Sequence, residues 1–210
     1  EEAIFLIDTS NKMNKGNRYS QIQNGIVNSI INDKTFINTK FGVITFSDTA
    51  LVGDRNYIDN PKDVCMKGNI SASNLLQPLF SLTDLNSKDG FRQLFQTNKI
   101  ITSESNHRNI NEALLLANDI YKCFGEENKN RAIIILTSGE MKYSVEAIKS
   151  IKEQQIKVIT LDISDDKDNN IEKLHGQLGE NLNDYIIGTI DGGNYNSVDT
   201  DMAEVAKRLL

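Results

Sequence analysis

The sequence predicts an α/β fold with a doubly wound, mostly parallel central sheet and helices on both faces. Short apolar runs suited to buried strands alternate along the chain with segments in which apolar residues recur at helical spacing. One run, AIIIL at 132–136, is apolar throughout, as is typical of a central strand covered on both faces. With 210 residues, 39% of them hydrophobic, the chain is long enough to bury such a core.

Five parallel strands are expected, together with an antiparallel edge strand near Ala50–Val52. The parallel strands are Ala3–Ile7, Phe41–Phe46, Ala132–Leu136, Val158–Ile163 and Tyr185–Ile190. Helices are expected where apolar residues repeat every three to four positions. These segments are 22–30, 110–121, 145–151 and 198–209.

Residues 54–107 break this alternation, because they hold both prolines and show no sustained period. We interpret them as an irregular connection with short helices. Such a length is unusual in a compact domain and is typical of functional segments. The prediction is therefore a single domain over residues 1–210, itself one domain of a larger chain, with a long variable connection at 54–107.

Charge and composition exclude several classes of function. The net charge of −6 and the pI near 5.0 argue against general nucleic-acid binding, which needs basic surface. The sequence has no apolar run of about 18 residues, so direct insertion into a membrane is not expected. Cys65 and Cys123 allow one disulfide at most, and they do not fix the compartment.

Three loops should meet at one edge of the predicted sheet. In an open parallel sheet, ligands bind beyond the carboxyl ends of the strands, where the strand order reverses. The loops that fall there are Asp8–Lys12, the segment entering a helix near Asn109, and Ser138–Glu140.

The stretches around these loops resemble the motifs of a von Willebrand factor A domain, also called an integrin I domain. FLIDTSNKM resembles the opening strand and Asp-x-Ser-x-Ser loop of that family, and AIIILTSGE its strand ending in Thr-Asp-Gly-Glu. HRNINEALLLA is similar to its threonine loop and following helix, and KFGVITFSDTA to its second strand. The resemblance runs from about Ala3 to Leu210 and implies the same fold.

In that family the three loops form a metal-ion-dependent adhesion site, which holds magnesium or manganese through oxygen ligands. Asp8 and Ser10 keep the first two ligand positions. Lys12 stands in place of the second serine, Arg108 in place of the threonine, and Ser138 in place of the aspartate. The resemblance therefore implies a degenerate site.

Lys12 and Arg108 offer no acceptor atom and bring positive charge. A cation beside Asp8 competes with a divalent ion, because like charges at close range repel by several kcal/mol even at an effective dielectric constant of about 20. We therefore expect no metal and no other cofactor, and a salt bridge from Asp8 to Lys12 or Arg108. Magnesium or manganese held by Asp8, Ser10 and Ser138 is the alternative.

A protein partner is expected at the same crevice, through an acidic residue that meets the basic side chains directly. The expected contacts are Lys12, His107, Arg108 and Glu140. The structural alternative is that Asp8 and Ser10 only cap their loop while the basic side chains point into solvent. The stretch DDKDNN at 165–170 is interpreted as a solvated loop, because it lacks the glycine and glutamate of a calcium loop.

Three functions are weighed. The first is a non-enzymatic adhesion or recognition module at the cell surface or outside the cell, which a Cys65–Cys123 disulfide or a glycan at Asn69 would favour. The second is a cytoplasmic scaffold subunit of a multiprotein complex. The third is a phosphatase of the haloacid-dehalogenase type, which is disfavoured because Ser10 stands where that chemistry needs a second aspartate.

Overall fold

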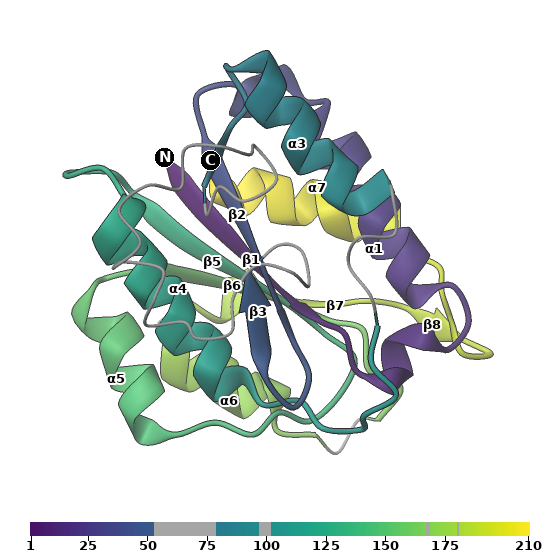
Figure 1. Cartoon of the computed structure of the whole chain (residues 1–210). Helices are drawn as coiled ribbons and strands as arrows, with labels where there is room; N and C mark the ends of the chain where they lie inside the picture. The colour runs from purple at the N-terminus through teal and green to yellow at the C-terminus, as the bar shows by residue number, and fades with distance from the viewer. Residues whose placement is uncertain (53–78, 97–101, 167–168, 180) are drawn as a thin grey trace.

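The computed structural model describes residues 1–52, 79–96, 102–166, 169–179 and 181–210 (Figure 1). Its main sheet has the strand order β3-β2-β1-β5-β6-β7, and β4 pairs with the start of β2. The neighbouring strands from β2 to β7 run parallel, whereas β3 and β4 run antiparallel to β2. The strands are β1 (Glu2–Asp8), β2 (Lys40–Phe46), β3 (Ala50–Val52), β4 (Phe80–Ser81), β5 (Arg131–Thr137), β6 (Lys157–Asp162) and β7 (Tyr185–Ile187).

Helices cover both faces of the sheet, so the predicted α/β class with an antiparallel edge strand is confirmed (Figure 1). On one face α1, α3 and α7 pack on the sheet, and on the other α4, α5 and α6 do. The helices are α1 (Arg18–Ile26), α3 (Leu85–Gln96), α4 (Ile110–Phe124), α5 (Val145–Glu153), α6 (Ile171–Leu178) and α7 (Val198–Leu209).

The strands form where they do because they are apolar on both sides. Every residue of β1 is buried, since β1 lies between β2 and β5 with a layer of helices above and below. Residues Ile133–Leu136 of β5 are likewise inaccessible to solvent. Such strands have no polar face to offer to water, which is the reason for the continuous apolar runs in the sequence.

Helix α3 lies within the segment that the sequence marks as irregular. With twelve residues, α3 is longer than the short helices expected in this segment. The helix is held by aromatic contacts, because Phe91 stacks on Phe41 of β2 with ring centroids 5.8 Å apart and meets Phe80 at 5.4 Å. Residues 54–78 and 97–101 of the same segment lie outside the described residues, and these include Cys65 and Asn69.

The predicted strand Tyr185–Ile190 is wrong in its second half. Strand β7 ends at Ile187, and Ile190 belongs instead to a hairpin of β8 (Ile190–Asp191) and β9 (Asn194–Tyr195). Gly192 and Gly193 have φ values of 55° and 84°, as a tight hairpin turn with two left-handed residues requires. The apolar spacing continues through the bend, so periodicity alone does not show it.

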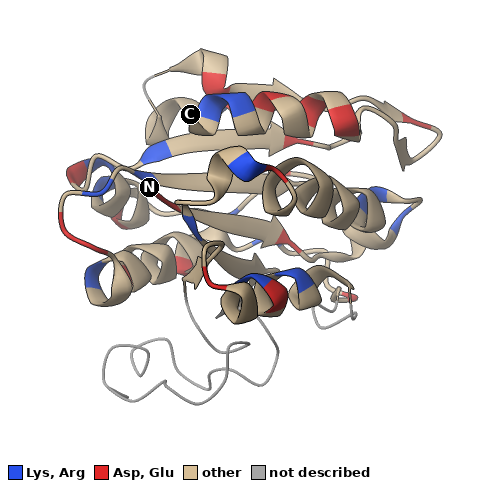
Figure 2. Ribbon diagram, turned by 90° about the horizontal axis from the view of Figure 1, so that it is seen from above, with Lys and Arg blue, Asp and Glu red and all other residues tan. Residues whose placement is uncertain are grey.

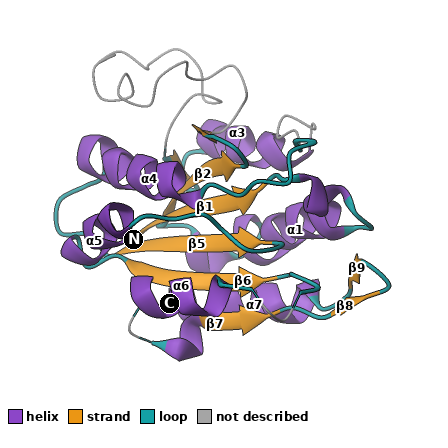
Figure 3. Cartoon of the chain, turned by 90° about the horizontal axis from the view of Figure 1, so that it is seen from below, coloured by secondary structure: helices purple, strands orange, loops and turns teal. Residues whose placement is uncertain are grey.

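The parallel strands all run in the same direction, so their carboxyl ends lie together at one end of the sheet (Figure 3). The chain termini lie toward the opposite end, where the strands begin (Figure 3). Between β1 and β5 the chain order reverses, because β2 lies on one side of β1 and β5 on the other. The carboxyl ends of β1 and β5 therefore flank a crevice, which is where a ligand site is expected.

Candidate functional site

Asp8, the last residue of β1, is a fully buried carboxylate with three hydrogen-bond donors. Its Oδ2 accepts from the backbone N–H of Ser138 at 2.8 Å and from the Ser138 hydroxyl at 2.6 Å. Its Oδ1 accepts from the backbone N–H of Ser10 at 2.8 Å. These donors compensate the cost of burying the charge, so Asp8 ties the loops after β1 and β5 together.

Arg108 lies across the mouth of this crevice. Its Nη1 donates to the Ser10 hydroxyl at 3.0 Å, and its Nε donates to the Glu140 carbonyl at 2.8 Å. A Cβ atom at Gly139 would lie 2.9 Å from Nη2 of Arg108, so a larger residue there would displace the guanidinium from this position. Two hydrogen bonds and one close packing contact thus fix the plane of the guanidinium.

The predicted salt bridge from Asp8 to Lys12 or Arg108 is wrong. Within the described ranges Asp8 makes no ion pair, because Ser10 and Ser138 already supply the donors that its oxygens need. Lys12 instead lies in a short 3-10 helix, Asn11–Asn14, and its Nζ is 3.7 Å from Oδ1 of Asp165. Of the two basic residues, only Arg108 reaches the crevice mouth.

Asp165 also binds Arg18, the bulkiest of the fully buried side chains, at 3.1 Å. Burial of Asp165 favours its neutral form. The hydrogen bond from Arg18 and the charges of Arg18 and Lys12 outweigh this and hold the pKa of Asp165 below its ordinary value. The interpretation of 165–170 as a solvated loop therefore misses the contacts of Asp165 with Lys12 and Arg18. The positions of these residues in the sequence do not indicate the contacts.

A hollow of about 620 Å³ opens beside Arg108. Three loops are joined there by backbone hydrogen bonds: Lys142 donates to the Arg108 carbonyl at 2.7 Å, and Asn109 donates to the Ser47 carbonyl at 2.7 Å. The residues that line it are Asp48, Asn106, His107, Arg108, Asn109, Glu140, Met141 and Lys142. The structure thus gathers three of the four predicted contacts, His107, Arg108 and Glu140, and leaves Lys12 outside.

Asn170, the residue before α6, binds the backbone of Met141, which lines this hollow. Its side-chain amide accepts from the Met141 N–H at 3.0 Å and donates to the Met141 carbonyl at 2.8 Å. The pair fixes the backbone of the loop after β5. No sequence signal marks Asn170, because an asparagine before a helix is equally consistent with an ordinary cap.

The comparison with known sequences decides the family. The sequence profile described as von Willebrand factor type A domain matches residues 3–191. The chain belongs to this family. Among the curated proteins, none matches the sequence.

Solved structures with the fold of this von Willebrand factor type A domain include three proteins of low sequence identity. Proximal thread matrix protein 1 from the mussel byssus, in a structure with a zinc-occupied MIDAS motif, is 13% identical to this chain with a TM-score of 0.66. The match covers 98% of this chain and 46% of the mussel chain. The PilB minor pilin of Streptococcus sanguinis is 12% identical with a TM-score of 0.66, over 99% and 61% of the two chains. The pilus adhesin SpaC of Lactobacillus rhamnosus GG is 12% identical with a TM-score of 0.63, over 99% and 30%. The domain thus spans less than half the length of the mussel protein.

The residues of this domain do not fit the divalent ion of the family's adhesion site. Magnesium requires about six oxygen ligands in near-octahedral order. Here the Ser10 hydroxyl accepts from Arg108, both Asp8 oxygens already accept hydrogen bonds, and the guanidinium stands in the mouth of the site. In the described part of the chain, no group of three histidine, cysteine or acidic side chains is placed to hold a metal.

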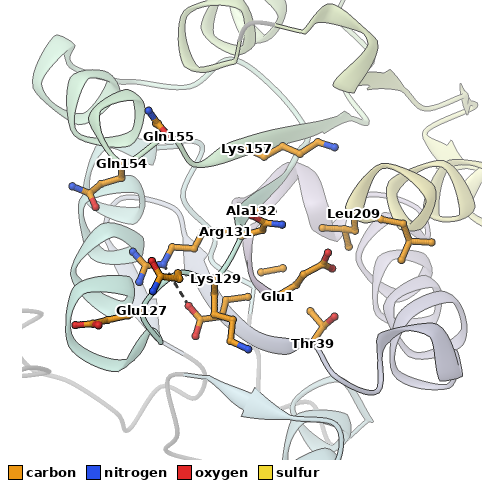
Figure 4. A pocket seen from close by; sticks show the side chains of 15 residues that line it. Glu1, Thr39, Glu127, Lys129, Arg131, Ala132, Gln154, Gln155, Lys157 and Leu209 are labelled. Atoms are coloured by element: carbon orange, nitrogen blue, oxygen red, sulfur yellow. Dashed lines mark ion pairs between the residues drawn. The ribbon is translucent and has the colours of Figure 1, made fainter.

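A second hollow, of about 670 Å³, lies at the opposite end of the domain (Figure 4). Glu1 and Leu209, next to the two chain termini, line it. Its arginine has an acidic partner, since Arg131 lies 3.5 Å from Glu2, and Lys157 donates to the backbone carbonyl of Arg208. Although this hollow is larger, we place the candidate site at the crevice, where Arg108 has no acidic partner among the described residues.

Basic and acidic residues are interspersed along the helices (Figure 2). Such a surface suits contacts of mixed charge better than a uniform anionic polymer. None of the described helices has the length and apolar character needed to cross a membrane.

Proposed function

We propose that this domain is a non-enzymatic protein-recognition module that binds a protein partner at the crevice without a divalent ion. The observation that carries the proposal is the position of Arg108, whose guanidinium is fixed between the Ser10 hydroxyl and the Glu140 carbonyl. A fixed cation at the mouth of an otherwise satisfied site supports direct contact with a partner. Membership of a family of protein-interaction domains supports the general class.

The chemistry of the crevice supports a role in binding and not in catalysis. The Ser138 hydroxyl donates to Asp8, and both residues are fully buried, so neither is free to attack a substrate. His107 lies 3.4 Å from Asp48 on the rim and so does not complete a nucleophile–base pair with Ser138. The phosphatase alternative also lacks its acid, since Ser10 occupies that position.

Calorimetry tests the absence of an ion. Magnesium and then manganese are titrated into chelator-treated protein, with Asp8→Ala as the site variant and Asp48→Ala as the matched control on the rim. We expect no saturable heat at millimolar ion and no rise in melting temperature, because Arg108 and the Asp8 hydrogen bonds exclude the ion. Binding that is lost in Asp8→Ala and kept in Asp48→Ala would instead establish the metal-dependent alternative.

We further propose that the domain acts at the cell surface or outside the cell. The pilus adhesin and the byssus protein with the same fold support this location. Cys123 is not a free thiol in the structure, and the other cysteine, Cys65, lies outside the described residues. Thiol titration in denaturant is expected to find no free thiol before reduction and two afterwards. Two free thiols in the unreduced protein would favour the cytoplasmic scaffold.

A further inference from the structure

Arg108 is the exception among the arginines that the structure describes. Each of the others lies within 4.0 Å of a carboxylate, whereas both hydrogen-bond acceptors of Arg108 are neutral oxygens. The paired residues are Arg18, Arg92, Arg131 and Arg208. A guanidinium cannot lose its proton in a protein, so Arg108 is a permanent cation. Asp48 and Glu140 line the same hollow, but no carboxylate of the described residues lies within 4.0 Å of the Arg108 guanidinium.

The geometry of Arg108 prepares it for a ligand. The hydrogen bonds of Nε and Nη1 fix the plane of the guanidinium, and Nη2 has no acceptor in the part of the chain that the structure describes. Arg108 also lines the 620 Å³ hollow, which is large enough to admit a side chain. Binding therefore costs little side-chain entropy, because the ordering has already taken place.

We propose that Arg108 receives a carboxylate of the partner, from an aspartate or glutamate side chain, with Nη2 as a donor. This inference rests on the proposed function and names the chemistry of the group bound at that site. A carboxylate suits this donor, because a charge-assisted hydrogen bond between a guanidinium and a carboxylate is about twice as strong as one between neutral groups. Lys12, which the sequence also suggests for this role, is already engaged by Asp165.

Ser10 and Gly139 act through Arg108 and are positioning residues. The Ser10 hydroxyl holds Nη1 at 3.0 Å, and the missing side chain of Gly139 leaves the space that the guanidinium fills. Asp8 stabilises the same loop by accepting from the Ser10 N–H. The residues that the family uses around an ion are thus arranged here around a side-chain cation.

The test uses capped peptides as probes: acetyl-Gly-Asp-Gly-amide and, as the matched neutral control, acetyl-Gly-Asn-Gly-amide. Binding is followed through the arginine Nε–H signals in nitrogen–proton correlation spectra, with chelator present throughout. Arg108 is assigned by the signal that disappears in Arg108→Lys, and Arg92 serves as the internal control because Asp89 and Asn32 already bind it.

We expect the aspartate peptide to shift the Arg108 signal saturably and to leave Arg92 unmoved, while the asparagine peptide shifts neither. Arg108→Lys is expected to weaken binding by about tenfold or more, because lysine keeps the charge and loses the planar donors. Its melting temperature, compared with the wild-type value, separates a local change at the site from loss of the fold.

Equal responses of Arg108 and Arg92, or equal effects of the two peptides, would overturn the inference. The proposed function would then still stand if calorimetry shows no ion binding. A shift of the Arg108 signal that appears only with added magnesium in place of chelator would overturn the inference and the metal-free function together.

Discussion

At the scale of single residues, the crevice shows how a buried carboxylate is stabilised without a salt bridge. Asp8 is completely inaccessible to solvent, yet its donors are two backbone N–H groups and one hydroxyl. The sequence places Asp8, Ser10 and Ser138 at the same sheet edge, because strand ends can be predicted. It does not show that Ser138 donates to Asp8, since that depends on the angle at which two loops meet.

Loss of the Ser138 hydroxyl is predicted to destabilise the fold. Ser138→Ala removes one of the three donors to a buried carboxylate, and hydrogen bonds to charged groups contribute about 1.5–3 kcal/mol. Urea unfolding at neutral pH measures the change in the free energy of unfolding. Ser20→Ala, which removes an exposed hydroxyl, is the control and should change it by less than about 0.5 kcal/mol. Equal stability of the two variants would show that the Ser138 hydroxyl is dispensable.

At the scale of secondary-structure elements, Asp165 joins three parts of the chain. It binds Arg18 at the start of α1 and Lys12 in the loop after β1, and Arg18 also donates to the Gly193 carbonyl of the β8–β9 hairpin at 3.3 Å. The sequence predicts a helix at 22–30, whereas α1 begins at Arg18, and no pattern indicates that this arginine faces inward. A basic residue in the first turn of a helix normally lies in solvent, so the sequence pattern predicts an exposed Arg18, whereas Arg18 is fully buried.

The Asp165 cluster predicts a specific dependence of stability on pH. Because the folded-state pKa of Asp165 is lowered, its contribution is fully present above the unfolded value of about 3.9 and is lost as pH falls through the folded pKa. Asp165→Asn should cost about 1–2 kcal/mol at pH 7, less than for a wholly buried pair, since the Asp165 side chain is 47% exposed. Urea unfolding should show this difference shrinking by pH 3.

The matched control for this experiment is Asp89→Asn. Asp89 pairs with Arg92 on the surface of α3, where its side chain is 62% exposed, so its loss should change the free energy of unfolding very little. An Asp165→Asn cost that stays the same at pH 7 and pH 3 would contradict the role of the ionised carboxylate.

At the scale of the whole molecule, the positions of the central strands follow from features that a sequence displays. Fully buried parallel strands read as continuous apolar runs, and segments with helical spacing separate them, so the ends of β1, β2, β5 and β6 are predicted to within one residue. The hairpin after β7 and the helix α3 are less predictable. Their positions depend on tertiary contacts, such as Phe91 on Phe41, which join residues far apart in the sequence.

The hydrogen bonding of Asp8 is the part of the site that differs most between expectation and structure, because serine donors take the place of the expected salt bridge. The replaced ligand positions predict a degenerate site, and the geometry shows how the remaining residues are used. Serines serve Asp8 and Arg108 as hydrogen-bond partners, and a glycine makes room for the guanidinium. A residue count at the motif does not distinguish this arrangement from an open site.

The placement of the two termini has a practical consequence for measuring interactions of this domain. Glu1 and Leu210 line one hollow at the end of the sheet where the strands begin, opposite the crevice. The seven residues of β1 span the distance of about 20 Å between these two ends. A biotin or a fluorescent dye attached at either end therefore lies away from Arg108. Molecules captured on a sensor chip through either terminus would present the crevice to the solution in a uniform orientation.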